Sequence, residues 1–324
     1  MRVCSGFVVA ASLCAAIAGT VLAQGRGGKE ALKGGQPAAG AKVPPSRAGE
    51  ERQSSEAAIL QYRAAVAFHN RQQYDFAVEE WERFLEKFPD DPLAAKAQHY
   101  AGVCYLQLKK PEQAIAAFEQ LTSKFPAFDL LDQAYLNLGM SYYAAAQAGK
   151  GELHDKAAAA FAAVIEKFPK STQAPQALFY RGESLYARNK KEDAVNSYRE
   201  LAEKHTKSQQ RPEALYALGV TLQELGRDAD AGAAYDRFLR DYPKHALATE
   251  VVMREADTLL AAKDFAKAEK QFALVARAPG FKLADYATLR QALAMYEQKK
   301  YAEAANLYAA LVKDFPKSQY VAAA

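Results

Sequence analysis

The chain is 324 residues long and its charge is nearly balanced, with 42 Lys and Arg against 38 Asp and Glu. Residues 1–55 contain seven of the basic and three of the acidic residues, which leaves 35 of each for the rest of the chain. Because this larger part is formally neutral, its charge gives no reason to expect nucleic acid or an anionic membrane as a partner.

The first 23 residues have the features of a secretory signal peptide. Arg2 provides a positive start, residues 7–18 form an apolar core, and Ala23 is a small residue before an expected cleavage site at Gln24. An uncleaved membrane anchor is the alternative, but this apolar run is shorter than the ~20 residues that a spanning helix needs. We therefore expect an exported protein, periplasmic or associated with the cell envelope, with no transmembrane segment in the mature chain.

Residues 24–55 differ in composition from the rest of the chain. They contain no aromatic residue and are rich in Gly, Ala, Pro and charged residues. Such a segment buries too little apolar surface to offset the entropy lost on folding, so we expect a disordered linker here. The folded part is then expected to span residues 56–324.

An aromatic residue followed by proline recurs through residues 56–324 at intervals near 37 residues. Pro89 and Pro126 are 37 residues apart, and the 74 residues between Pro169 and Pro243 correspond to two intervals. The marker occurs as Phe88-Pro89, Phe125-Pro126, Phe168-Pro169, Tyr242-Pro243 and Phe315-Pro316. A period of this length indicates stacked supersecondary repeats, none of which buries its apolar face alone.

Two other kinds of position recur with the marker. Small residues occupy the first position, as Ala65, Gly102, Gly139, Gly182, Gly219, Ala256 and Ala292. Aromatic residues occupy the second, as Trp81, Phe118, Phe161, Tyr198, Tyr235, Phe272 and Tyr308. Apolar spacings of three, four and seven predict two amphipathic helices per repeat, joined by a short polar turn and ended by the proline. The third repeat has six extra residues around 147–152, between its two helices.

These positions resemble the tetratricopeptide repeat, in seven repeats from Glu56 to Tyr320. The resemblance implies an all-α, right-handed superhelical solenoid of about seven helix-turn-helix repeats. The segments Phe168-Pro169-Lys170-Ser171 and Phe315-Pro316-Lys317-Ser318 are also similar to repeats of bacterial envelope proteins. Two such groups are the Tol-Pal system tetratricopeptide protein and the outer-membrane β-barrel assembly lipoprotein.

No motif for catalysis, metal binding or phosphate binding is present in the sequence. The histidines are isolated, at positions His69, His99, His154, His205 and His245, and no phosphate-binding glycine loop occurs. Cys104 is the only thiol left once the signal peptide is removed, and a buried core position is expected for it. We therefore expect neither an enzyme nor a cofactor.

The resemblance implies that the first helix of each repeat lines a concave groove that binds protein. The residues expected to line it are Tyr62, His69, Asn70, His99, Gln107, Tyr143, Phe179, Glu183, Tyr186, Tyr216, Gln223 and Glu224. Aromatic side chains beside amides and acids suit a protein or peptide partner. For each aromatic residue, packing between neighbouring first helices is an equally open alternative.

The sequence thus favours an exported scaffold that binds protein partners through its groove, in cell-envelope assembly or maintenance. One alternative is a structural homo-oligomer, because the last helix lacks a polar cap and is expected to expose Leu307, Leu311 or Val312. A second alternative is a module that binds a glycan or another ligand.

Overall fold

The computed structural model describes residues 53–324 of the chain. The signal peptide expected at residues 1–23, and nearly all of the linker expected at residues 24–55, lie outside the described residues. The first described helix begins at Glu56, where the Ser55 hydroxyl accepts a hydrogen bond from the backbone N–H of Ala58 at 3.1 Å.

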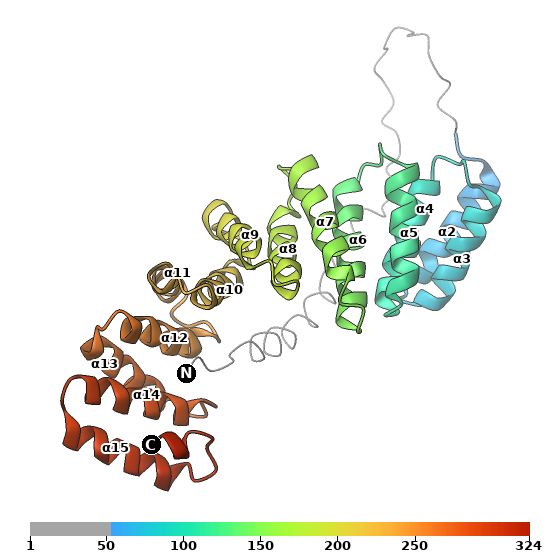
Figure 1. Ribbon diagram of the computed structural model, residues 1–324. Helices are drawn as coiled ribbons and strands as arrows, with labels where there is room; N and C mark the ends of the chain where they lie inside the picture. The colour runs from blue at the N-terminus through green and yellow to red at the C-terminus, as the bar shows by residue number, and fades with distance from the viewer. Residues whose placement is uncertain (1–52) are drawn as a thin grey trace. The chain divides into compact units, whose positions relative to one another are not determined.

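The described residues form fourteen α-helices, followed by one short 3-10 helix, and contain no strand (Figure 1). The elements are α2 (Glu56–Asn70), α3 (Tyr74–Lys87), α4 (Ala94–Gln107), α5 (Pro111–Lys124), α6 (Leu131–Gln147), α7 (Leu153–Lys167), α8 (Ala174–Ala187), α9 (Lys191–Lys204), α10 (Arg211–Glu224), α11 (Asp228–Asp241), α12 (Ala248–Ala261), α13 (Phe265–Ala276), α14 (Ala284–Glu297), α15 (Tyr301–Asp314) and η2 (Val321–Ala323). The even-numbered helices are the first helices of seven repeats and the odd-numbered ones are the second helices. The expectation of an all-α solenoid of about seven helix pairs is confirmed.

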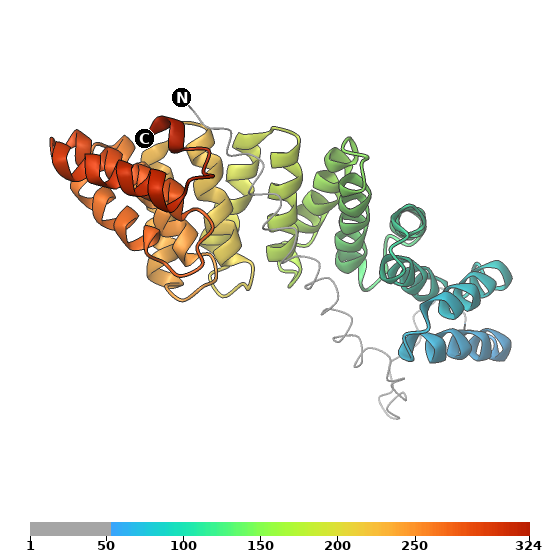
Figure 2. The same ribbon diagram turned by 90° about the horizontal axis from the view of Figure 1, so that it is seen from below.

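The chain divides into two compact units, an N-terminal unit up to Asn137 and a C-terminal unit from Leu138 onward. In the N-terminal unit α3 packs between α2 and α4, and α4 packs against α5. In the C-terminal unit each helix from α7 to α15 packs against its neighbours along the chain (Figures 1 and 2). Each unit therefore builds its core from contacts between successive helices.

Small residues let the two helices of a repeat approach each other. A Cβ atom added at Gly102 would lie 2.7 Å from the ring of Phe118, and one added at Gly139 would lie 2.5 Å from the ring of Phe161. Phe118 and Phe161 are fully buried. The small position and the aromatic position of a repeat therefore face each other, and close packing between them explains why both recur.

The second helices end where the aromatic-proline marker predicts. The helices α3, α5, α7, α11 and α15 all end one residue before the marker aromatic. However, α9 also ends one residue before His205, where no proline follows. The tight turn after the helix, closed by the bond from Ser208 N–H to His205 C=O at 3.0 Å, therefore forms without proline.

The six extra residues of the third repeat lie between its helices, as expected. They lengthen α6 to 17 residues and extend the turn before α7, in which Gly149 has a φ of 114°. This positive φ is one that residues with a side chain rarely adopt.

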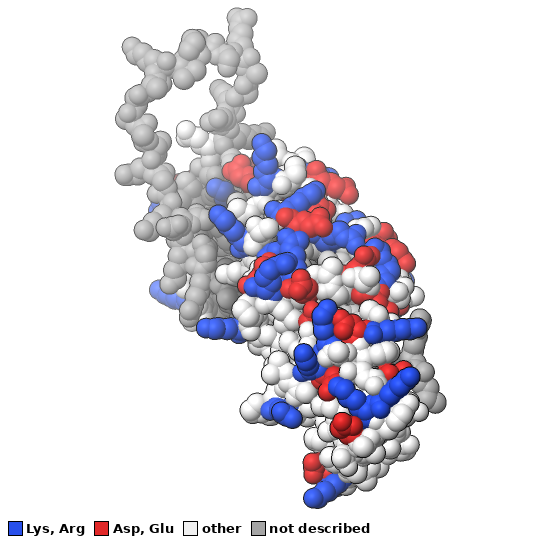
Figure 3. Space-filling model, turned by 90° about the vertical axis from the view of Figure 1, so that its left-hand side faces the viewer, with Lys and Arg blue, Asp and Glu red and all other residues white. Residues whose placement is uncertain are grey.

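Charged residues of both signs are interspersed over the face of the molecule in Figure 3, as the balanced composition implies. None of the helices in residues 53–324 combines the length and apolar character that crossing a membrane requires.

Candidate functional site

A groove lies on the first helices of the N-terminal unit, between α2, α4 and the turn that joins α5 to α6. Its volume is about 570 Å³. Seven partly exposed apolar side chains line it: Ile59, Tyr62, Val66, Leu93, Tyr100, Phe128 and Leu130. Three charged side chains, Arg63, Lys96 and Asp129, complete the lining. We call this site the first-helix groove.

The aromatic wall of the first-helix groove rests on the core. The ring of Tyr62 meets that of Trp81 edge-on at 4.9 Å, and Tyr100 stacks on the other side of the repeat against Trp81 at 5.8 Å. Trp81 itself is fully buried. Burial raises the pKa of both tyrosine hydroxyls, so they stay neutral and available as hydrogen-bond donors. Both rings of the wall therefore rest on the same buried residue.

The charges at the rim of the groove have no partner within the described chain. Arg63, Lys96 and Asp129 are exposed, and none of them forms a hydrogen bond or ion pair with another described residue. A second recess of about 440 Å³ continues past Phe128 and shares Lys96 with the groove. The apolar floor thus lies beside charges that are free to bind a ligand.

The residues of the N-terminal unit that the sequence predicted to line the groove differ in how far they are buried. Tyr62 lines the groove, while Asn70 and Gln107 end α2 and α4 at the surface or near it. His69 is half-buried, with its Nδ1 atom 3.2 Å from Cys104 Sγ. His99 is only 2% exposed and lies beneath the groove.

His99 supports the groove from below. Its ring contacts Tyr100 at 5.3 Å and Phe128 at 5.5 Å. Burial, assisted by His69, lowers the pKa of His99 to about 4, so the imidazole is neutral at physiological pH. His99 therefore packs as a neutral ring under two residues of the groove wall.

Phe128 is a groove residue that the first-helix pattern missed. In five other turns the equivalent residue accepts a hydrogen bond from the backbone N–H two residues later, at 2.9 to 3.3 Å, and these residues are Asp91, Ser171, Ser208, His245 and Ser318. Phe128 and Phe281 cannot make this bond. A phenylalanine at position 128, where most repeats have a polar side chain that stabilises the turn, was the feature of the sequence that could have indicated this groove residue.

The first helices of the C-terminal unit are joined by their own polar side chains. The Tyr186 hydroxyl on α8 donates to both carboxylate oxygens of Glu224 on α10 at 2.8 Å. The Tyr216 hydroxyl on α10 donates to Glu250 on α12 at 2.5 Å. These bonds join each first helix to the next, and the first helices follow one another along one side of this unit (Figure 1).

Two arginines extend this network. Arg254 lies 3.4 Å from Glu250, with its guanidinium 5.7 Å from the centre of the Tyr216 ring. Further along, the Nε of Arg290 donates to Asp257 at 2.8 Å. Burial raises the pKa of Asp257 despite this neighbouring cation. The charges of this face thus pair with each other.

The other residues of the C-terminal unit that the sequence predicted to line the groove are either buried in the core or hydrogen-bonded within the chain. Tyr143, Phe179 and Tyr216 are 8%, 3% and 2% exposed, so they pack in the core. Glu183 accepts a hydrogen bond from Tyr198, and Gln223 accepts one from Tyr235, both at 2.6 Å. These side chains lie on the first helices, as the pattern implied, but the polar atoms of Glu183 and Gln223 are bound by tyrosines of the second helices α9 and α11.

Four stretches of the chain match models of the tetratricopeptide repeat family: residues 62–129, 133–171, 181–246 and 286–318. No protein of curated function matches the sequence.

Among solved structures, the chain is similar to the C-terminal part of a TPR repeat-containing protein from Cytophaga hutchinsonii. The TM-score is 0.60 at 15% identity, over 80% of this chain and 96% of the other. It is also similar to the apo form of RapI, with a TM-score of 0.54 at 11% identity over 82% and 78% of the two chains. A tetratricopeptide repeat protein from Parabacteroides merdae gives a TM-score of 0.50 at 14% identity over 82% and 96%. At these identities the likeness is one of fold. Together with the seven helix pairs and the matched repeats, it shows that the chain belongs to the tetratricopeptide repeat family.

Proposed function

We propose that this chain is a non-catalytic scaffold that binds a protein partner in the first-helix groove of its N-terminal unit. One observation carries the proposal: partly exposed aromatic side chains form a preformed recess beside Arg63 and Lys96, which have no ion-pair partner among the described residues. Recesses of ~300–1,000 Å³ with an apolar lining and a few polar groups are typical of binding sites.

The groove suits a segment that inserts an apolar side chain between Tyr62 and Phe128. Full burial of one such side chain contributes ~1.5–3 kcal/mol. A carboxylate on the same segment would reach Lys96 or Arg63 at the rim, where charge sets orientation and association rate more than affinity. A protein or peptide partner combines these groups, whereas a purely polar glycan would leave the apolar wall unused.

A pair of matched variants tests the groove. Phe128→Ser removes a groove side chain and restores the turn residue found at Ser171 and Ser208, so the fold should be unharmed. Phe281→Ser makes the same change at the same turn position in the C-terminal unit, outside the groove.

The measurement is cross-linking of the full-length protein in cells, followed by mass spectrometry of the captured proteins. We expect a partner captured by the wild type to be lost with Phe128→Ser, and with Lys96→Glu, but retained with Phe281→Ser. Equal capture by all four proteins would overturn the proposed site.

We further propose that the protein acts after export, in the cell envelope. This rests on the expected signal peptide at residues 1–23 and on the similarity to envelope repeat proteins described above. Mass spectrometry of the intact exported protein tests it. The proposal predicts an N-terminus at Gln24, whereas a chain that starts at Met1 and is found only in the cytoplasm would refute export.

Self-association is a second candidate, favoured by one exposed position. Leu60 is 61% exposed, although the equivalent residues of the other six first helices are all fully buried by the preceding repeat: Ala97, Ala134, Ala177, Ala214, Val251 and Ala287. In α15, Val312 is 43% exposed, as expected, while Leu311 is buried. Light scattering at tens of micromolar would detect an oligomer that Leu60→Glu dissolves. A strict monomer would remove this candidate.

A further inference from the structure

An exposed apolar face lies on α2, on a different side of this helix from the residues that line the first-helix groove. Leu60, Ala64, Ala67 and Phe68 are spaced by three and four residues, which places them on one side of α2. The ring of Phe76, at the start of α3, stacks on the ring of Phe68 at 5.5 Å and extends the face. Leu60 is 61% exposed and Phe76 is 54% exposed. We call these five residues the N-terminal face.

In the other six repeats the matching side of the first helix is covered. Ala67 is exposed, whereas its equivalents are all buried: Cys104, Ser141, Ser184, Thr221, Thr258 and Ala294. The second helix of the preceding repeat provides this cover, since a Cβ added at Gly232 of α11 would lie 3.1 Å from the hydroxyl of Thr258 on α12. The N-terminal face is therefore the surface that a first helix presents to another helix.

Phe76 occupies a position at which the repeat does not need an apolar side chain. The equivalent residues of the other six second helices are all polar and exposed: Gln113, Lys156, Asp193, Asp230, Lys267 and Glu303. Packing within the repeat thus gives no reason for a phenylalanine here. Neighbouring exposed apolar side chains of this kind mark interaction surfaces in soluble proteins.

Opposite charges lie at the two ends of the N-terminal face. Glu56 begins α2, four residues before Leu60, and Arg71 directly follows α2, four residues after Ala67. Both are exposed, and neither pairs with another described residue. Two copies of α2 packed antiparallel would bring each Glu56 to the Arg71 of the other copy, and each Leu60 to Ala67. A parallel arrangement would instead place like charges together, which is unfavourable.

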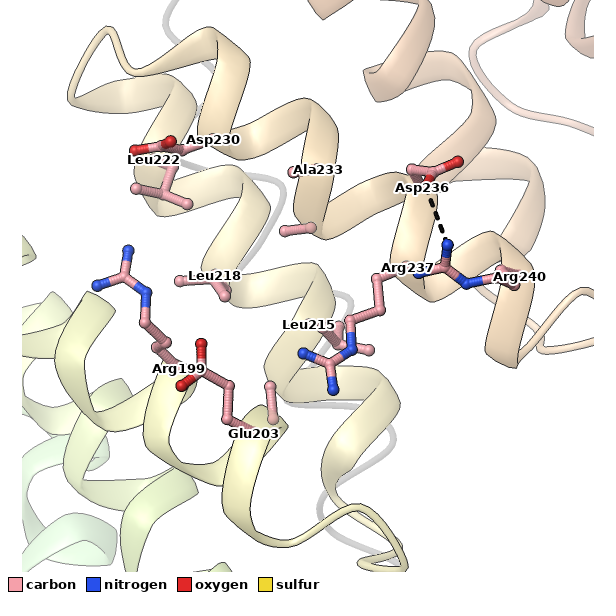
Figure 4. A pocket seen from close by; sticks show the side chains of 12 residues that line it. Arg199, Glu203, Leu215, Leu218, Leu222, Asp230, Ala233, Asp236, Arg237 and Arg240 are labelled. Carbon is pink, nitrogen blue, oxygen red and sulfur yellow. Dashed lines mark ion pairs between the residues drawn. The ribbon is translucent and has the colours of Figure 1, made fainter.

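The recess between α9 and α11 in the C-terminal unit offers no comparable surface (Figure 4). Its leucines on α10, Leu215, Leu218 and Leu222, are only 1%, 6% and 1% exposed. Its arginines are matched by an equal number of acidic residues: Arg199, Arg237 and Arg240 beside Glu203, Asp230 and Asp236. This recess therefore presents little accessible apolar area and no net charge to a partner.

We propose that the N-terminal face pairs two copies of this chain into a two-fold symmetric dimer, with their α2 helices antiparallel. Leu60 of each copy packs against Ala67 and the Phe68–Phe76 pair of the other, and contacts between Glu56 and Arg71 close both ends. Because both copies use the same patch, assembly stops at the dimer. The proposed dimer rests on the self-association candidate above and does not depend on binding in the first-helix groove, so either can fail without the other.

Analytical ultracentrifugation of the full-length protein over a range of concentrations tests the dimer. We expect a monomer–dimer equilibrium with no larger species. Phe76→Gln introduces the residue found at the equivalent Gln113, so the fold should be kept. It should raise the dissociation constant about tenfold or more, as loss of a buried aromatic anchor does. Val312→Gln replaces another exposed apolar residue, on α15, and should leave the equilibrium unchanged.

Charge reversal identifies the antiparallel arrangement. Glu56→Arg alone and Arg71→Glu alone should each weaken the dimer, because both contacts then join like charges. An equimolar mixture of these two variants should restore it, because every contact in the mixed dimer joins opposite charges again. The restored dimer would also show that both variants are folded.

Several results would overturn the proposal. A strict monomer would remove the dimer. An open series of larger oligomers, or equal weakening by Val312→Gln, would indicate head-to-tail contact instead. A dimer that Phe76→Gln does not weaken would place the contact on another surface. Charge variants without effect, or no recovery in the mixture, would rule out the antiparallel pairing of α2.

Discussion

Replacing Gly102 with Ala is expected to destabilise the N-terminal unit. The new Cβ would lie 2.7, 2.8 and 2.9 Å from three ring atoms of Phe118. Ordinary carbon contacts are ~3.5–4.0 Å, so the ring or α4 must move by most of an ångström. Phe118 is fully buried and packs against His99 at 5.9 Å between ring centres, which leaves it little room.

The expected size of the effect combines two opposing contributions. Overpacking a well-filled core costs ~1–3 kcal/mol. Alanine in place of glycine within a helix gains ~0.5–1 kcal/mol. The net loss in the free energy of unfolding is therefore about 1 kcal/mol, within a range of about 0–2.5 kcal/mol.

Urea unfolding followed by tryptophan fluorescence provides the assay. Trp81 is the only tryptophan of the chain, is fully buried and lies 5.8 Å from Tyr100, two residues from the substitution. Because each repeat contacts only its neighbours, fluorescence should report loss of this unit directly. Gly151→Ala is the control, since a Cβ there meets no atom within 4 Å.

A double-mutant cycle identifies the cause. Phe118→Leu alone should lower the free energy of unfolding. In the Gly102→Ala background it should lower this free energy by less, because the smaller side chain leaves space for the new methyl group. A Gly102→Ala protein that is more stable than the wild type, or strictly additive effects, would refute the close-packing explanation.

Three more predictions concern buried polar groups. Burial raises the pKa of Glu183 from its usual 4.5, so its contribution to stability is present below pH 4.5 and is lost as pH rises through the folded pKa. Glu183→Gln should therefore match the wild type near pH 4 and have a higher melting temperature at pH 7. Arg211→Met should cost about 2–3 kcal/mol in urea unfolding, because it breaks a 2.8 Å ion pair with Asp241, which is itself 31% exposed. Burial raises the pKa of the Cys104 thiol to about 12, so with the other two cysteines replaced by serine it should react with a thiol reagent only after unfolding.

Each of these has an outcome that contradicts it. An equal stability difference between Glu183→Gln and the wild type at both pH values would show that burial does not penalise that carboxylate. Arg240→Met removes a more exposed ion pair and should cost less than ~1 kcal/mol. A cost for Arg211→Met no larger than that would contradict its structural role. Rapid labelling of Cys104 in the native protein would contradict its burial.

The fold could be predicted from the sequence because the same pattern of small, aromatic and proline positions occurs in seven successive repeats. Gly102 and Phe118 occupy positions that recur in every repeat. The repeat period alone therefore predicts where each helix lies, where the turns fall and where each repeat ends. Although Thr206 stands where other repeats have proline, α9 still ends one residue before His205, at the place that the repeat period gives.

The binding surface was less predictable because a repeat pattern gives a residue's position on a helix but not the neighbours that cover it. Tyr62 and Tyr216 occupy equivalent first-helix positions, three residues before Ala65 and Gly219, yet Tyr62 lines an open groove and Tyr216 binds Glu250. The difference arises from side chains on the next repeat. Phe128 lies in a turn, where helical periodicity carries no information.

We propose that the first-helix face is open to a partner in the N-terminal unit and closed by its own side chains in the C-terminal unit. The most direct test places a photocrosslinking amino acid at Lys96 or at Gln223 in the full-length protein in cells. We predict that position 96 yields cross-links to a partner protein, and that position 223 yields only links within the chain. Partner cross-links from position 223, with none from position 96, would contradict the account.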